Sequence, residues 1–176
     1  ASDVYKRQDV SLSSLGFEAD WNRKGIACDG AVIYYGPAFI LDLYKKGRQV
    51  VNRYYLHALF HCLFCHLYTR KGREKEMWDL ACDIAMESVL DGMYEKCIHI
   101  PQSPLRRETY LRIRRFLTGN RTAGASSEEE RNIVLTAERV YHALMEMALP
   151  ERRLRQLQAE FHLDDHDPVS YTHLTL

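Results

Sequence analysis

The chain has 176 residues, of which 46% are hydrophobic, and its 24 basic and 24 acidic side chains leave no net charge. This is enough apolar chain for one domain with a buried core, while the neutral balance argues against a nucleic-acid-binding surface. No apolar run is long enough to cross a bilayer, so we expect no membrane partner. The neutral charge balance predicts no nucleic-acid partner. The five cysteines fit no secretory framework, which predicts reduced thiols in a cytoplasmic protein.

Short strands are predicted near the N-terminus. Residues 12–21 and 26–35 are strand-like, and the second run is interrupted by Asp29-Gly30, a common hairpin-turn pair. Gly36-Pro37 then breaks the chain. The run 38–44 (AFILDLY) fits a helix and a strand equally well, because so short an apolar segment has no diagnostic period.

The remainder of the chain is predicted to be helical. Ser127 and Glu130 form an S-x-x-E capping box, which predicts that the helix carrying Ile133 to Ala148 opens there. Gly92 is expected to act as the C-cap of the helix before it. The predicted helices are 50–68, 74–91, 105–117, the one opened by Ser127, and 151–161. The architecture is therefore expected to be α+β, mainly helical with a small N-terminal β-sheet.

Three histidines are the only strongly polar side chains in residues 54–68 (YYLHALFHCLFCHLY). A segment that is apolar on every side predicts a buried helix, in which unsatisfied imidazoles cost about 1–3 kcal/mol. His57 and His61 are four residues apart and share one helix face, which is how the two-histidine half of a helical zinc site is built. The alternative is a pair of core histidines hydrogen-bonded to backbone carbonyls or to a carboxylate.

A third ligand is expected from the helix over 74–91, which should pack antiparallel to the histidine helix because the connecting turn is short. Its acidic residues form a stripe that is either a ligand source or a solvated face: Glu76, Asp79, Asp83 and Glu87. Asp83 lies mid-helix and would complete two histidines and one carboxylate, leaving one zinc position open. His66 competes as third ligand, but only if the helix ends or bends near Cys65.

These residues resemble a known family. The segments that carry the resemblance are DGAVIYYGP (29–37), HALFHCLFCH (57–66), MWDLACDIAMESVLD (77–91), TAERVYHAL (136–144) and DDHD (164–167). They are similar to the metallopeptidase-like domain at the N-terminus of bacterial VWA-like proteins, with its H-E-x-x-H-x4-H motif and a following W-x-x-A-x-D segment. The resemblance implies a zincin-like domain and a zinc ion held by His57, His61 and either Asp83 or His66. It also implies a VWA-like domain beyond this fragment and a MoxR-type AAA ATPase as partner.

One departure from that pattern concerns catalysis. Ala58 stands where the family carries the glutamate that acts as general base, and losing such a base typically costs about 10²–10⁴-fold in rate. We therefore expect a metallopeptidase-like pseudoenzyme, unless Glu87 lies near enough to substitute. The alternative function is a non-metal helical scaffold that works with the VWA domain and the ATPase. An active metalloprotease with another base ranks last.

The two ends are interpreted separately. SDVYKRQ and VSYTHLTL resemble translated adaptor sequence found at the edges of metagenomic reading frames. We predict artefactual tails at 1–8 and 168–176, with the metallopeptidase-like domain at 9–167, and His173 is discounted as a ligand for that reason.

Overall fold

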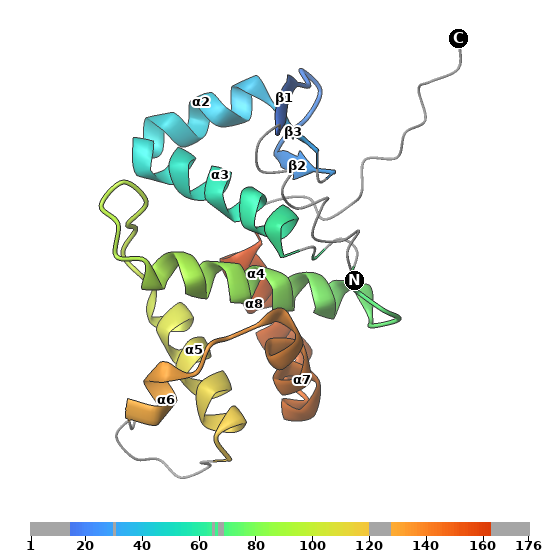
Figure 1. Ribbon diagram of the computed structural model, residues 1–176, viewed down its shortest axis with the longest axis vertical. Coiled ribbons are helices and arrows are strands. Elements are labelled where there is room, and N and C mark those ends of the chain that lie inside the picture. Colours follow the sequence, from blue (N-terminus) through green and yellow to red (C-terminus); the bar gives the residue numbers. More distant parts are fainter. Residues whose placement is uncertain (1–14, 30, 65, 67–68, 120–127, 163–176) are drawn as a thin grey trace, which may run out of the picture. The chain divides into compact units, whose positions relative to one another are not determined.

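The computed structural model describes residues 15–29, 31–64, 66, 69–119 and 128–162, which belong to two compact units (Figure 1). Unit 1 contains the chain up to Lys71 together with Lys96–Ile98, and unit 2 contains Gly72–Glu95 and His99–His162. The described chain is mainly helical with one small N-terminal sheet, which confirms the predicted α+β class. The predicted tails, the DDHD segment and Cys65 lie outside the described residues.

The sheet of unit 1 has three strands, β1 (Gly16–Ala19), β2 (Ile26–Cys28) and β3 (Val32–Tyr35). β3 is central, with β1 parallel and β2 antiparallel to it. The predicted interruption at Asp29 is present: its Oδ1 accepts hydrogen bonds from the backbone N–H groups of Ala31 (2.9 Å) and Val32 (2.8 Å). This side-chain turn reverses the chain between β2 and β3.

Two helices complete unit 1. α2 (Pro37–Lys46) settles the ambiguous run 38–44 as a helix, whose first residue is a proline with φ already suited to that position. α3 (Arg48–Leu63) carries His57 and His61. α3 ends five residues before the predicted Tyr68, where Phe64 caps it by donating its N–H to the Phe60 carbonyl.

α3 is buried along one face only, contrary to the prediction of burial on every side. Its buried residues are Arg53, His57, Ala58 and His61. Tyr55 (38% exposed) and Phe64 (48%) lie on the other sides. Apolar composition overstated the burial because aromatic side chains are often left partly exposed on a surface.

Two cysteines lie side by side between β2 and α3 in unit 1. The structure brings the sulfur atoms of Cys28 and Cys62 together, and the prediction of reduced thiols stays a prediction. The sequence pattern suggested only the local C-x-x-C of Cys62 and Cys65, because a partner 34 residues away becomes visible only when the strand is placed beside the helix. Cys82 and Cys97 are unpaired thiols, one buried and one exposed.

Unit 2 is a helical bundle built around α4 (Lys75–Gly92). α4 packs against α7 (Ala137–Met147) and α8 (Glu151–Phe161), while α5 (Pro104–Leu117) packs against α7, α8 and the short α6 (Glu128–Asn132). The largest fully buried side chains of this core are Trp78, Ile84, Leu90, Ile113, Leu144, Leu157 and Phe161. α4 starts where Glu74 accepts from the N–H groups of Glu76 and Met77.

Two helix boundaries in unit 2 differ from prediction. The single helix expected after Ser127 is divided into α6 and α7, because Thr136 starts a new helix by accepting a hydrogen bond from the Arg139 N–H (3.4 Å). Ser127 itself lies outside the described residues. Gly92 is the last residue of α4, and Met93 takes the C-cap position with right-handed backbone angles.

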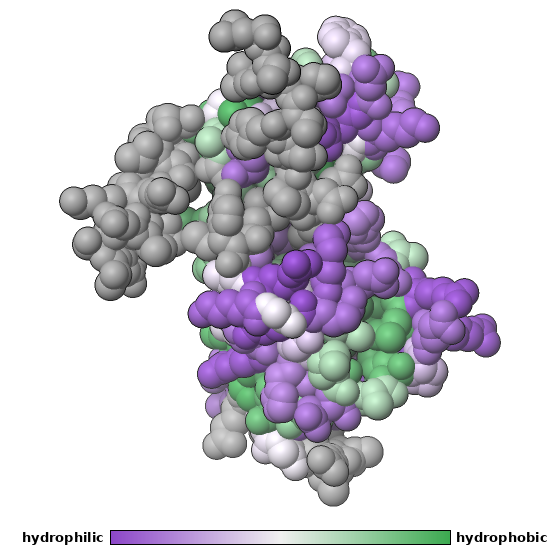
Figure 2. Space-filling model, turned by 90° about the vertical axis from the view of Figure 1, so that its right-hand side faces the viewer, coloured by the Kyte–Doolittle hydropathy of each residue, from purple (hydrophilic) through white to green (hydrophobic). Residues whose placement is uncertain are grey.

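The described surface is largely hydrophilic on the face drawn in Figure 2, with hydrophobic residues gathered in a smaller region. Among the described residues, no helix combines the length and apolar character needed to cross a membrane.

Candidate functional site

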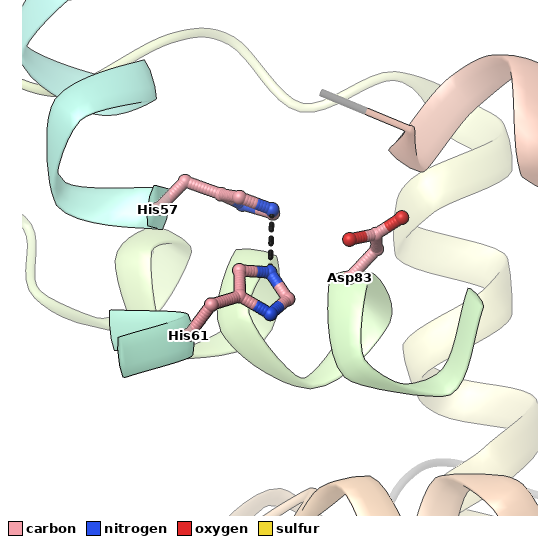
Figure 3. Close-up of side chains that lie close together, drawn as sticks. All are labelled: His57, His61 and Asp83. Atoms are coloured by element: carbon pink, nitrogen blue, oxygen red, sulfur yellow. Dashed lines mark hydrogen bonds between the residues drawn. The ribbon is translucent and has the colours of Figure 1, made fainter. Parts of the chain in front are cut away.

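His57 and His61 present paired imidazoles on one face of α3. Their Nε2 atoms are 2.8 Å apart and their rings are 0% and 2% exposed (Figure 3, dashed line). The spacing of four residues produces this pairing, because it places both side chains one turn apart on the same side of a helix. Two buried ring nitrogens therefore face a common point.

The spacing of the two nitrogens is close to that of two ligands on one metal ion. Two nitrogen ligands at about 2.0–2.1 Å from a tetrahedral zinc lie about 3.3 Å apart. The observed Nε2 separation of 2.8 Å is shorter than this by about half an ångström, so the two rings would have to move apart by that amount to hold an ion. Without a metal, the same contact is a hydrogen bond in which one ring donates and the other accepts.

His66 meets the opposite edge of the His61 ring. Its Nδ1 lies 3.2 Å from Nδ1 of His61, and its backbone N–H donates to the His61 carbonyl (3.1 Å). The early end of α3 allows this, because a continuous helix would have carried His66 to another face. Nδ1 is the ring nitrogen of His61 that does not face His57, so His66 is placed to orient His61.

Asp83 lies in the middle of α4 in unit 2 and is 2% exposed. The acidic stripe to which it belongs changes character along the helix. Glu76 is exposed and Asp79 pairs with Lys75 (3.4 Å), as expected for a solvated face, whereas Asp83 and Glu87 are buried. A buried carboxylate requires a charged or hydrogen-bonding partner, because its desolvation is costly.

Glu87 has such a partner in Arg106 of α5. Nη1 of Arg106 donates to Oε2 of Glu87, which is completely buried, and the same guanidinium lies 3.7 Å from Asp91. Burial opposes the Arg106 charge, yet the attraction of Glu87, with smaller contributions from Tyr110 and Asp91, raises its pKa above the usual value. Sequence reasoning missed Arg106. The pair Arg106-Arg107 gave no signal that the first side chain is largely buried (12% exposed) and the second exposed.

His162 is the second residue that sequence reasoning missed. It caps the C-terminal end of α8, and its Nδ1 lies 3.9 Å from Oδ2 of Asp83, within unit 2. The signal in the sequence was weak, namely a histidine directly after the last predicted helix.

Ala58 is completely buried among Ile26, Cys28 and Ile33, the apolar cluster between α3 and the sheet. The position that follows His57 therefore belongs to the core of unit 1. A methyl group there has no proton-accepting atom.

The comparisons with known proteins agree with the metal-binding interpretation. No solved structure matches this chain. A family model described as a "putative metallopeptidase domain" matches residues 10–168, nearly the whole sequence. The buried histidine pair and this match lead to one conclusion: the chain belongs to that family of metallopeptidase domains.

Proposed function

We propose that this chain is a zinc-binding metallopeptidase-like domain with little or no peptidase activity. The observation that carries the proposal is the buried pair of Nε2 atoms of His57 and His61, 2.8 Å apart. Asp83 is proposed as the third ligand. His66 is assigned to the outer shell, where it holds His61 by the nitrogen that a metal does not use.

The donor set supports this assignment. His57, His61 and Asp83, the side chains drawn in Figure 3, are a group that could hold a metal ion. Two imidazoles and one carboxylate are a common zinc ligand set. With only these three protein ligands, a bound ion would keep one position open and could supply Lewis-acid polarisation of a substrate carbonyl there. The chain's own residues would hold the ion and set the orientation of the rings.

The proposed lack of catalysis rests on two residues. Ala58 has no group that takes up a proton, and it packs in an apolar cluster. Glu87, the substitute considered from the sequence, is engaged by Arg106 in a buried ion pair. General-base assistance typically contributes about 10²–10⁴-fold, so hydrolysis without it would be slow.

The partners are part of the same proposal. On the resemblance to bacterial VWA-associated proteins, the domain works in the cytoplasm beside a VWA-like domain and a MoxR-type AAA ATPase. Co-purification of the full-length protein with that ATPase, lost when this domain is deleted, is the expected result. Recovery of the ATPase without this domain would contradict the proposal.

Metal binding is tested by zinc titration against a chromophoric chelator, with metal content measured after gel filtration. The wild type is expected to retain one zinc ion, and His61→Ala and Asp83→Ala to lose it. Asp79→Ala is the matched control, because Asp79 lies one turn before Asp83 and pairs with Lys75 on the surface. Absence of zinc from the wild type, or retention by His61→Ala, would favour the alternative helical scaffold.

Activity is tested with zinc-loaded wild type on unfolded protein substrates. We expect no cleavage above that of the metal-free protein. Robust cleavage that disappears in His61→Ala would overturn the assignment of Ala58 and establish an active peptidase with another base.

A further inference from the structure

We propose that His162 is a metal ligand beside Asp83, so that unit 2 supplies a carboxylate and an imidazole to the proposed zinc ion and the ligand set rises to four. This inference rests on the proposed function and extends its ligand set. Its starting point is the 3.9 Å separation between Nδ1 of His162 and Oδ2 of Asp83.

That separation is longer than a hydrogen bond and close to the spacing of two ligands on one cation. Ligands at about 2.0–2.1 Å from a tetrahedral metal lie about 3.3–3.4 Å apart. His162 is 59% exposed, so its side chain has room to close the remaining distance. Asp83 is 2% exposed and supplies the fixed member of the pair.

The backbone that carries His162 is anchored. Phe161, the residue before it, is completely buried and contacts the ring of Tyr110 at 5.8 Å. The His162 N–H donates to the Gln158 carbonyl (2.9 Å), which continues the hydrogen bonding of α8. The histidine is therefore held at a defined place although its ring is accessible.

One arginine ties this end of α8 to the helix that carries Asp83. Arg106 donates from Nε to the Glu160 side chain and from Nη2 to the Glu160 carbonyl, both at 3.2 Å. The same guanidinium pairs with Glu87, one turn beyond Asp83 on α4. Arg106 thus fixes both helices, and the spacing of Asp83 and His162 follows from that bracing.

A fourth protein ligand changes the kind of site. Catalytic zinc sites keep one position for water or substrate, whereas structural sites are filled by four protein ligands. A site completed by His162 has no such position, which agrees with the alanine at position 58. The ion would then stabilise the fold instead of activating a substrate.

The experiment labels histidines with diethylpyrocarbonate in the full chain, with and without added zinc, and maps the modified residues by mass spectrometry. His162 should be modified without zinc and protected when zinc is bound. His142, exposed on α7, should be modified equally in both states. His162→Ala should weaken zinc binding by about 10-fold or more, while His142→Ala leaves it unchanged.

Two failures are distinguishable. If zinc binds and depends on His61, but His162 is labelled equally with and without it, the fourth ligand is wrong and the proposed function stands. If the wild type binds no zinc, both fall. Protection of His162 without any loss of affinity in His162→Ala would also overturn the ligand assignment, because it would show shielding without coordination. Unchanged circular dichroism and thermal unfolding of the variant exclude misfolding.

Discussion

Replacing Ala58 by glutamate restores the family's usual residue, yet the structure predicts a destabilised protein. The alanine is completely buried among Ile26, Cys28 and Ile33. A longer side chain there overpacks the cluster, at a cost of about 1–3 kcal/mol. The carboxyl group must also stay protonated, because an unpaired charge in an apolar cluster is far more expensive.

The protonation cost depends on pH. The pKa of a buried glutamate is raised above its ordinary value of about 4.3, so the variant loses stability as pH rises above that value. At 1.36 kcal/mol per pH unit, keeping the group neutral costs about 3.7 kcal/mol at pH 7 and about 1 kcal/mol at pH 5. The control is Ala58→Gln, which has the same size and no ionisation. It should show only the overpacking cost, with no added pH dependence.

The assay is urea denaturation of both variants without metal at pH 5 and pH 7. We expect Ala58→Glu to fall below Ala58→Gln by about 3–4 kcal/mol at pH 7 and by about 1 kcal/mol at pH 5. Equal stability of the two variants at pH 7 would refute the reasoning. It would mean that the side chain at position 58 reaches water, as a catalytic glutamate does.

Three further predictions concern the rest of the molecule. Arg106→Ala should lower the free energy of unfolding by about 3–5 kcal/mol in urea denaturation, because it leaves Glu87 buried without its cation. Arg107→Ala, at the exposed neighbouring position, should change that free energy by less than about 0.5 kcal/mol. Equal effects of the two variants would contradict the ion-pair argument. Zinc at about 100 times its Kd should stabilise the protein by about 2.7 kcal/mol and raise Tm by about 5–10 °C in calorimetry, reversed by EDTA, and an unchanged Tm would contradict binding to the folded state. Burial, followed by repulsion from Asp83, raises the pKa of Cys82 above its ordinary 9.0. This thiol should therefore resist iodoacetamide at pH 8.5 while the exposed Cys97 reacts, and the stability that the neutral Cys82 thiol contributes is lost as pH rises beyond 9.0. Rapid alkylation of Cys82 in the folded protein would contradict its burial.

Local patterns predicted much of the fold. The strands over 26–35, the helix α4 and the pairing of His57 with His61 follow from short-range chemistry, namely an Asx turn, an N-terminal cap and a spacing of four residues. The early end of α3 could not be predicted in this way. Apolar residues continue past Leu63, and no Gly or Pro directly after it marks the boundary. The single helix predicted after Ser127 places Thr136 in its interior, whereas the structure has it at the N-cap of α7, a position that threonine favours.

The missed residues of the candidate site depend on tertiary packing. Arg106 forms ion pairs with Glu87 on α4 and Glu160 on α8, which lie 19 and 54 residues away in the sequence. His162 becomes relevant only because α8 packs beside α4. Neither residue belongs to a motif, since the spacing between α4, α5 and α8 has no signature in a single sequence.

At the proposed metal site, Arg106 would affect how quickly and how tightly an ion is captured. This guanidinium braces α4 against α8 through Glu87 and Glu160, so the backbone that carries Asp83 is held in place and Asp83 would lose little conformational entropy on binding an ion. In that proposal, the remaining adjustment would fall to the imidazole of His162, which is accessible at the end of α8. Weakening the brace would therefore slow or loosen capture without removing a single donor atom.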